Sequence, residues 1–331
     1  MKRFTIPALL VFCVCTLFTL TASAKTQLTY SNFFPPTHIQ SQLAEAWIKE
    51  VEARTNGEIT INYFPAGTLT KAPQTYDGVV QGIADIGMTV LAYSRGRFPV
   101  AAAIDLPMGY TSGVQATNVA NGVLEKFNPE EFNDTELMFL HAHGPGIIHT
   151  RDKAVKTLDD LKGLKIRGTG TSGKVVAALG GSPVGKSMGE TYQMLQKGVV
   201  DGSVHPVEAN NGWKLGEVVN YMTQNFSTAY TTTFAVFMNK KKWAGLTQKQ
   251  QDTIRAINAE FALKHGQAWD EADELGMEFF KEKGGEVISQ SDAEAKKWAE
   301  QAASVIDEYI QSVADKDIDG QAIVDYIKAN L

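Results

Sequence analysis

The chain has 331 residues, with 31 lysines and arginines against 37 aspartates and glutamates, and a formal net charge of −6. This acidic balance argues against nucleic acid or an anionic membrane surface as a partner, although a local pocket can still bind an anion. The length exceeds what one hydrophobic core usually holds, so we expect two lobes.

Residues 1–24 have the pattern of a secretory signal peptide. Lys2 and Arg3 precede an apolar run, and Ala22-Ser23-Ala24 supplies the small residues of a cleavage site. The apolar run is shorter than the about 20 residues that span a bilayer. We therefore expect cleavage before Lys25, a periplasmic location, and a mature chain with 29 basic and 37 acidic residues.

The mature chain offers little catalytic chemistry. Both cysteines, Cys13 and Cys15, lie inside the predicted signal peptide, which excludes disulfides, thiolate metal sites and a cysteine nucleophile. The histidines show no zinc-binding spacing, and there is no G-x-S-x-G motif. We expect no enzyme activity, no metal and no cofactor.

Strands and helices alternate in the first part of the chain. A helix from about residue 73 is expected to bury Val79 and Ile83 on one face. The order β-α-β-α-β predicts a largely parallel sheet with helices on both faces. The expected strands are 28–33, 58–64, 85–91 and 136–144, and the other expected helices are 40–57 and 118–127.

The second part of the chain predicts another lobe and a return to the first. The apolar strand 231–239 is expected to carry the chain back. Residues 247–283 contain no proline and keep helical spacing, which gives a helix of about 55 Å at 1.5 Å per residue. Such a helix exceeds one small lobe and is expected to bridge both. The predicted lobes are 25–145 plus about 234–275 (lobe I), and 146–233 plus about 276–331 (lobe II).

The segment GGSPVGKS, residues 180–187, matches the spacing of a phosphate-binding P-loop. That motif needs a buried strand before it and a helix after it. The preceding KVVAALGG can be a short strand or a helix that ends at glycine, so the local pattern leaves this open. Because an exported protein meets little ATP, and no later apolar strand ends in a magnesium-binding acid, a nucleotide-dependent enzyme is the less favoured alternative.

A second glycine-rich segment, GTGTSG at residues 168–173, follows the strand-like LKIR. A dinucleotide site needs an apolar first strand, which LKIR is not. The arrangement instead places Arg167 between a strand end and a helix start, where backbone N–H groups favour anions. A guanidinium can bind a carboxylate or sulfonate with two parallel hydrogen bonds. Arg167 is thus an anion clamp or, alternatively, a surface arginine at a strand end.

Motifs along the whole mature chain resemble one family, the extracytoplasmic solute-binding proteins of TRAP transporters, DctP type. The motifs are ITINYFPAGTL, QGIADIGM, DLPMGY, VKTLDDLKGLKIRG, GSPVGKSMGETYQMLQKGVVDGSVHP, GEVVNYMT and the long helix after Thr247. The resemblance implies a two-lobed α/β fold of the type II-like periplasmic binding class, with parallel or mixed sheets flanked by helices. It implies ligand-induced closure on a small organic anion, which is delivered to the sodium-coupled membrane permease subunits of the transporter. An ABC-type or sensor-associated receptor is the alternative within binding proteins.

The resemblance also places the ligand-gripping arginine of the family at Arg167. Sialic-acid-type members carry a second arginine where this chain has Ile147, an asparagine at His205, a large aromatic at Met188 and a polar residue at Phe33. One cation, apolar walls and a histidine suggest a small monoanion, such as a short hydroxy- or keto-acid or a sulfonate like isethionate.

Further ligand-binding candidates follow from position alone, and each can equally be an ordinary surface or helix residue. Some lie at strand ends that face the expected cleft, some follow His205 in the chain, and one lies after the Pro35-Pro36 turn. They are Tyr93, Thr89, Thr231, Thr233, Glu208, Asn211, Trp213 and His38.

Overall fold

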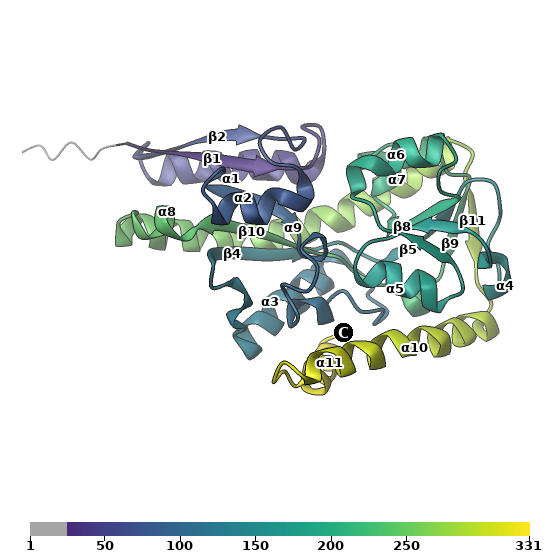
Figure 1. Cartoon of the computed structure of the whole chain (residues 1–331). Helices are drawn as coiled ribbons and strands as arrows, with labels where there is room; N and C mark the ends of the chain where they lie inside the picture. The colour runs from purple at the N-terminus through teal and green to yellow at the C-terminus, as the bar shows by residue number, and fades with distance from the viewer. Residues whose placement is uncertain (1–24) are drawn as a thin grey trace, which may run out of the picture.

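The computed structural model describes residues 25–331; the predicted signal peptide lies outside them. These residues form two sheets, each covered by helices, that lie side by side (Figure 1). A long helix, α9 (Gln248–Glu282), runs along both sheets. The predicted two-lobed α/β class with a bridging helix is therefore confirmed.

The first sheet has the strand order β2-β1-β3-β10-β4. β1 pairs in parallel with β2 and β3, whereas β10 is antiparallel to both of its neighbours. β10 thus returns from the second lobe to the first, as its apolar sequence predicted, and all seven of its residues are buried. The strands are β1 (Thr26–Asn32), β2 (Ile59–Phe64), β3 (Ile86–Val90), β4 (Thr135–Ala142) and β10 (Thr233–Asn239).

The helices α1 (Ile39–Arg54), α2 (Thr75–Val80), α3 (Gly113–Phe127) and α8 (Lys240–Ala244) pack around this sheet. α1 buries Ala44, Trp47, Ile48 and Val51, the stripe with helical spacing. The prediction for Ile83 was wrong: α2 ends at Val80, so Ile83 lies beyond the helix and its side chain is 56% exposed.

The second sheet has the order β11-β9-β5-β8-β6-β7 and is also mixed. Its strands are β5 (Gly146–Thr150), β6 (Lys165–Arg167), β7 (Ser182–Val184), β8 (Gly202–Pro206), β9 (Tyr221–Gln224) and β11 (Glu286–Ser289). Its helices are α4 (Leu158–Leu161), α5 (Thr171–Ala178), α6 (Met188–Gln196) and α7 (Ala209–Gly212).

The last two helices extend along the molecule (Figure 1). α10 (Asp292–Ala314) contacts α5 in the second lobe, and α11 (Gly320–Ala329) packs on α3 beside the first sheet. The predicted residue ranges of the two lobes stay a prediction.

The structure resolves the ambiguity around GGSPVGKS. The preceding KVVAALGG belongs to helix α5 and the turn after it, and the short strand β7 lies inside the motif. A P-loop requires the order strand, loop, helix. This segment therefore lacks the fold context of a phosphate-binding loop.

Candidate ligand-binding site

A cavity lies between the two lobes, where several strands of both sheets end. Lobe I contributes the segment after β1, the end of β3 and the start of β10, while lobe II contributes the ends of β6 and β8 and the start of α6. The carboxyl ends of strands are the usual ligand sites of α/β sheets. The lining residues are Phe33, Phe34, Val90, Tyr93, His143, Arg167, Thr169, Ser172, Met188, Val204, His205, Pro206, Glu208, Trp213, Tyr230, Thr232, Phe234 and Trp269.

Arg167 is a buried cation in this cavity, with only 5% of its surface exposed. Its Nε donates to the backbone carbonyl of Lys186 at 2.8 Å. Between residues 25 and 331, no carboxylate forms a salt bridge with its guanidinium, and its Nη groups donate no hydrogen bond. A buried charge without a partner costs several kcal/mol. The site is therefore suited to an anion that supplies the missing acceptors.

Two histidines place neutral rings near this guanidinium. Burial, then the neighbouring His149 and Arg167, holds the pKa of His205 well below its usual range. Burial also lowers the pKa of His143 to about 4, with a smaller contribution from Arg167. The His205 ring stacks on His149 at 3.8 Å, and within the described residues neither of its nitrogens has a hydrogen-bond partner. A neutral imidazole can donate one hydrogen bond and accept another, so His205 offers both to a ligand.

Aromatic side chains form much of the cavity wall. Phe33 stacks on Phe34 with ring centroids 4.4 Å apart, and its ring is also nearly parallel to that of Trp213 at 6.2 Å. Phe234 and Trp269, which also line the cavity, stack on each other with ring centroids 5.1 Å apart. Such a wall favours a ligand with an apolar, flat body.

The two lobes touch directly beside the cavity. The Tyr93 hydroxyl of lobe I accepts a hydrogen bond from the backbone N–H of Met188 in lobe II at 3.0 Å. Gly170, with φ of +54°, approaches Ala92 so closely that a Cβ at Gly170 would lie 2.7 Å from the Ala92 Cβ. Only glycine fits this approach.

Seven of the twelve candidate residues line the cavity: Phe33, Tyr93, Arg167, Met188, His205, Glu208 and Trp213. They come from both lobes and from segments up to 180 residues apart in the sequence.

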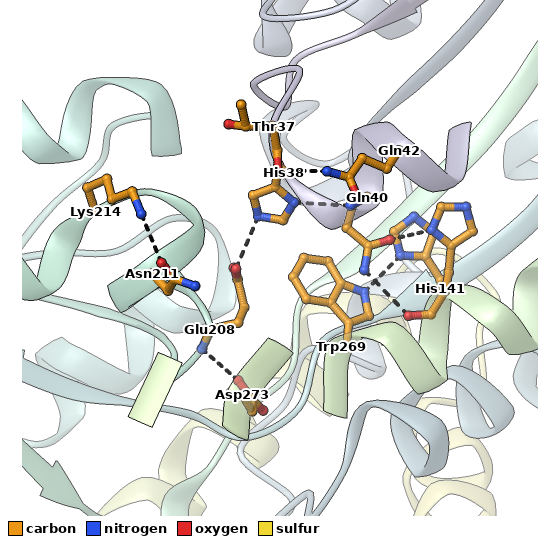
Figure 2. Close-up of polar contacts among 11 residues, drawn as sticks. Thr37, His38, Gln40, Gln42, His141, Glu208, Asn211, Lys214, Trp269 and Asp273 are labelled. Atoms are coloured by element: carbon orange, nitrogen blue, oxygen red, sulfur yellow. Dashed lines mark hydrogen bonds and ion pairs between the residues drawn. The ribbon is translucent and has the colours of Figure 1, made fainter. Parts of the chain in front are cut away.

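The other five candidates lie outside the cavity lining. The hydroxyl groups of Thr89, Thr231 and Thr233 donate to Ala72 O, His143 O and Asp105 Oδ1 respectively, at 2.6–2.7 Å. Asn211 accepts a hydrogen bond from Lys214 Nζ, and His38 is hydrogen-bonded to the carboxylate of Glu208 (Figure 2).

Several lining residues were not predicted, above all Phe34, His143, Ser172, Phe234 and Trp269. Ser172 belongs to the GTGTSG segment that pointed to Arg167. His143 lines the cavity, whereas His141, two residues earlier, accepts a hydrogen bond from Trp269 Nε1 inside lobe I. The position of Phe234 and Trp269 in the cavity wall could not be predicted from the sequence. An apolar residue produces the same sequence pattern whether its side chain faces the hydrophobic core or a cavity.

Residues 25–331 contain neither a candidate metal site nor a candidate membrane span. No group of three or more histidine, aspartate or glutamate side chains is arranged to hold a metal ion there. No helix in the same range has both the length and the apolar character needed to cross a membrane.

Two α/β lobes around a buried cavity, joined by crossing strands and a bridging helix, define the class of two-lobed solute receptors. The family model of "Bacterial extracellular solute-binding protein, family 7" (DctP) matches residues 30–312. The chain belongs to this family, the solute-binding proteins of TRAP transporters, which bind organic acids and are not enzymes.

Solved structures support this assignment. A TRAP solute-binding protein from an unidentified marine microbe, in complex with metahydroxyphenylacetate, has a TM-score of 0.88 and 30% identity, and the match covers 92% of this chain and 98% of that one. A protein from Bordetella bronchiseptica with bound mandelate has a TM-score of 0.86 and 30% identity, with the same coverage. The 2,3-diketo-L-gulonate-binding periplasmic protein of Escherichia coli is 26% identical over 283 residues, covering 84% of this chain and 85% of that protein.

Proposed function

We propose that the protein captures an aromatic monocarboxylate in the cavity between its lobes and delivers it to the membrane permease of a TRAP transporter. The observation that carries this proposal is the buried Arg167, which has no anionic partner in residues 25–331. A planar carboxylate can accept two parallel hydrogen bonds from a guanidinium and supplies the missing charge.

The side chains that line the cavity determine what kind of group can be attached to the carboxylate of the ligand. Among residues 25–331, Arg167 is the only lysine or arginine that lines the cavity, and much of the remaining lining is aromatic or aliphatic. A single anionic group attached to a ring fits such a cavity better than a polyhydroxylated sugar acid, whose hydroxyls would lose water without gaining partners. The related proteins at 30% identity that hold metahydroxyphenylacetate and mandelate support this choice.

A short hydroxy-acid, keto-acid or sulfonate is the second candidate, because the cavity volume is only about 40 Å³. That volume corresponds to about three ordered waters. An aromatic acid requires the aromatic wall to move outward, whereas a three-carbon acid fits with smaller adjustments.

The proposed function also includes where the protein is located, how its lobes close on the ligand and how the ligand reaches the permease. The signal peptide exports the chain to the periplasm, where relatives such as the Escherichia coli protein are found. The ligand stabilises the closed arrangement of the lobes because it contacts residues of both. The closed, loaded form docks on the permease subunits, and the protein touches the membrane only through them.

The test is a thermal-unfolding panel on residues 25–331 with benzoate, mandelate, 3-hydroxybenzoate, lactate, pyruvate, isethionate and glucuronate. A ligand at a thousand times its dissociation constant adds about 4 kcal/mol, which raises the melting temperature by about 6 °C for a chain of this size. We expect this shift with an aromatic monocarboxylate (benzoate, mandelate or 3-hydroxybenzoate) and not with glucuronate, and we expect Arg167→Gln to abolish it.

The unliganded Arg167→Gln protein should melt at the same temperature as the wild type or higher, because the substitution removes an unpaired buried charge. The control is Arg95→Gln, an exposed arginine outside this cavity, which should keep the full ligand shift. A shift that survives in Arg167→Gln would refute the proposed role of the arginine.

A further inference from the structure

Glu208 brings a second charged group into the cavity that contains Arg167. It follows β8, precedes α7, and is 2% exposed. A buried carboxylate usually has a cation or several hydrogen-bond donors around it. In residues 25–331 the Glu208 carboxylate has one donor, His38, and no lysine or arginine within salt-bridge distance.

The bond to His38 leaves the charge on Glu208. His38 caps helix α1, and its Nδ1 accepts the backbone N–H of Gln40 at 3.2 Å. Because Nδ1 is an acceptor, the ring proton lies on Nε2, which donates to Glu208 Oε2 at 3.1 Å (Figure 2). A histidine with one protonated nitrogen is neutral. The His38 ring therefore places no positive charge beside Glu208, and Oε1 has no partner among the described residues.

The backbone around Glu208 is held in place from two sides. Its N–H donates to Asp273 Oδ1 of helix α9 at 2.7 Å (Figure 2). α9 passes so close that a Cβ at Gly276 would lie 2.7 Å from the Glu208 Cα. On the other side, a Cβ at Gly212 would lie 2.5 Å from Glu208 Oε2 and 2.8 Å from His38 Nε2. Glycine at position 276 thus permits the close approach of α9 to this backbone, and glycine at position 212 leaves room for the hydrogen bond between Glu208 and His38.

We propose that Glu208 determines specificity in this receptor: its free oxygen accepts a hydrogen bond from a hydroxyl group of the ligand, and its charge rejects ligands with a second carboxylate. The inference rests on the proposed function, in which Arg167 binds the first carboxylate. A hydroxyl is the donor that matches an unpartnered acceptor, and a second anionic group would meet like charge with no cation to offset it. His38 is a positioning residue, since it orients Glu208 without lining the cavity.

The test measures dissociation constants by calorimetry for ligands that differ in one group. The pairs are mandelate and phenylacetate, lactate and propionate, and 3-hydroxybenzoate and benzoate. Hydrogen bonds to charged groups contribute enough for the hydroxylated member to bind about 10- to 100-fold more tightly. Isophthalate, with a second carboxylate in place of the hydroxyl, should bind at least about 100-fold more weakly than 3-hydroxybenzoate.

Substitutions at Glu208 and at His38 separate the effect of the Glu208 charge from the effect of its position. Glu208→Gln keeps an oxygen for the His38 bond but has no charge, so the hydroxyl preference should shrink and the penalty for isophthalate should fall at least about tenfold. Glu217→Gln, an exposed carboxylate of the same lobe, is the control and should change neither ratio. His38→Ala should reduce the hydroxyl preference, and His38→Gln, whose amide can still donate to Glu208, should restore it.

The outcomes distinguish this inference from the proposed function. If the wild type binds monocarboxylates through Arg167, yet hydroxylated and plain members bind equally and Glu208→Gln changes no ratio, the specificity role is overturned and the receptor function stands. Preference for phenylglycine, with an ammonium group where mandelate has its hydroxyl, would also overturn the hydroxyl assignment. If no carboxylate binds the wild type, the proposed function fails and this inference fails with it.

Discussion

We predict that Asp105 makes the folded protein less stable as the pH rises from about 4 to about 7. The residue is 5% exposed, and its Oδ1 accepts hydrogen bonds from the Thr233 N–H at 2.8 Å and hydroxyl at 2.7 Å, where β10 begins. Burial raises the pKa of Asp105 from 3.8 to about 7, and the two bonds from Thr233 lower it by less. Between these pH values the folded protein keeps a proton that the unfolded chain has released. The contribution of Asp105 to stability is therefore greatest below about pH 4 and is lost as the pH rises to about 7.

The size of the effect follows from the two pKa values. At 1.36 kcal/mol per pH unit, the difference corresponds to about 4 kcal/mol. Asp105→Asn keeps an oxygen that can accept both bonds but cannot ionise, so the variant avoids this loss. With an unfolding entropy of about 2.1 cal/mol/K per residue over about 300 residues, the melting temperature of the variant should gain about 6 °C on the wild type between pH 4 and pH 8.

The assay is thermal unfolding of both proteins by circular dichroism at pH 4, 5, 6, 7 and 8. Buried histidines such as His143, whose pKa is lowered to about 4, act in the opposite direction, but equally in both proteins, so they cancel in the difference. Asp134→Asn, whose side chain is 66% exposed, should show no such trend. A constant difference between Asp105→Asn and the wild type across this range would refute the reasoning.

Two further predictions concern the contacts between the lobes. Gly170→Ala should lower the affinity for the best carboxylate about tenfold, because the new methyl group would lie 2.7 Å from Ala92 and hold the lobes apart. Gly163→Ala is the control: Gly163 also has a positive φ, +79°, but a Cβ there would have nothing within 4 Å, so the affinity should stay unchanged in the same titration. Tyr93→Phe should weaken binding about fivefold, because the Met188 N–H loses its acceptor; unchanged affinity would mean that this hydrogen bond does not contribute to closure.

Much of the fold could be predicted because it depends on local patterns. The helical periodicity and absence of proline in residues 247–283 predicted α9 almost to its ends. The apolar strand 231–239 predicted a return to the first sheet, where β10 lies between β3 and β4. The end of α2 was less predictable, because Ile83 continued an apolar pattern after the chain had left the helix.

A residue of the site could be predicted only where a charged side chain lay within a recognisable local sequence pattern. Arg167 was such a residue, between a strand end and a glycine-rich helix start. Thr231 and Thr233 do lie where the chain crosses between the lobes, but their hydroxyls bind His143 O and Asp105, which are 88 and 128 residues away. The direction of a side chain depends on such distant partners, and no periodicity in the sequence records them.

In the function that we propose, Arg167 binds the carboxylate of the ligand between the lobes. The most direct measurement is a crystal structure of residues 25–331 with the carboxylate that gives the largest thermal shift. We predict both carboxylate oxygens about 2.8 Å from the two Nη atoms of Arg167, with the body of the ligand against Phe33 and Trp213. A ligand whose carboxylate lies elsewhere, with the Arg167 guanidinium turned to an acceptor of the protein, would contradict the account.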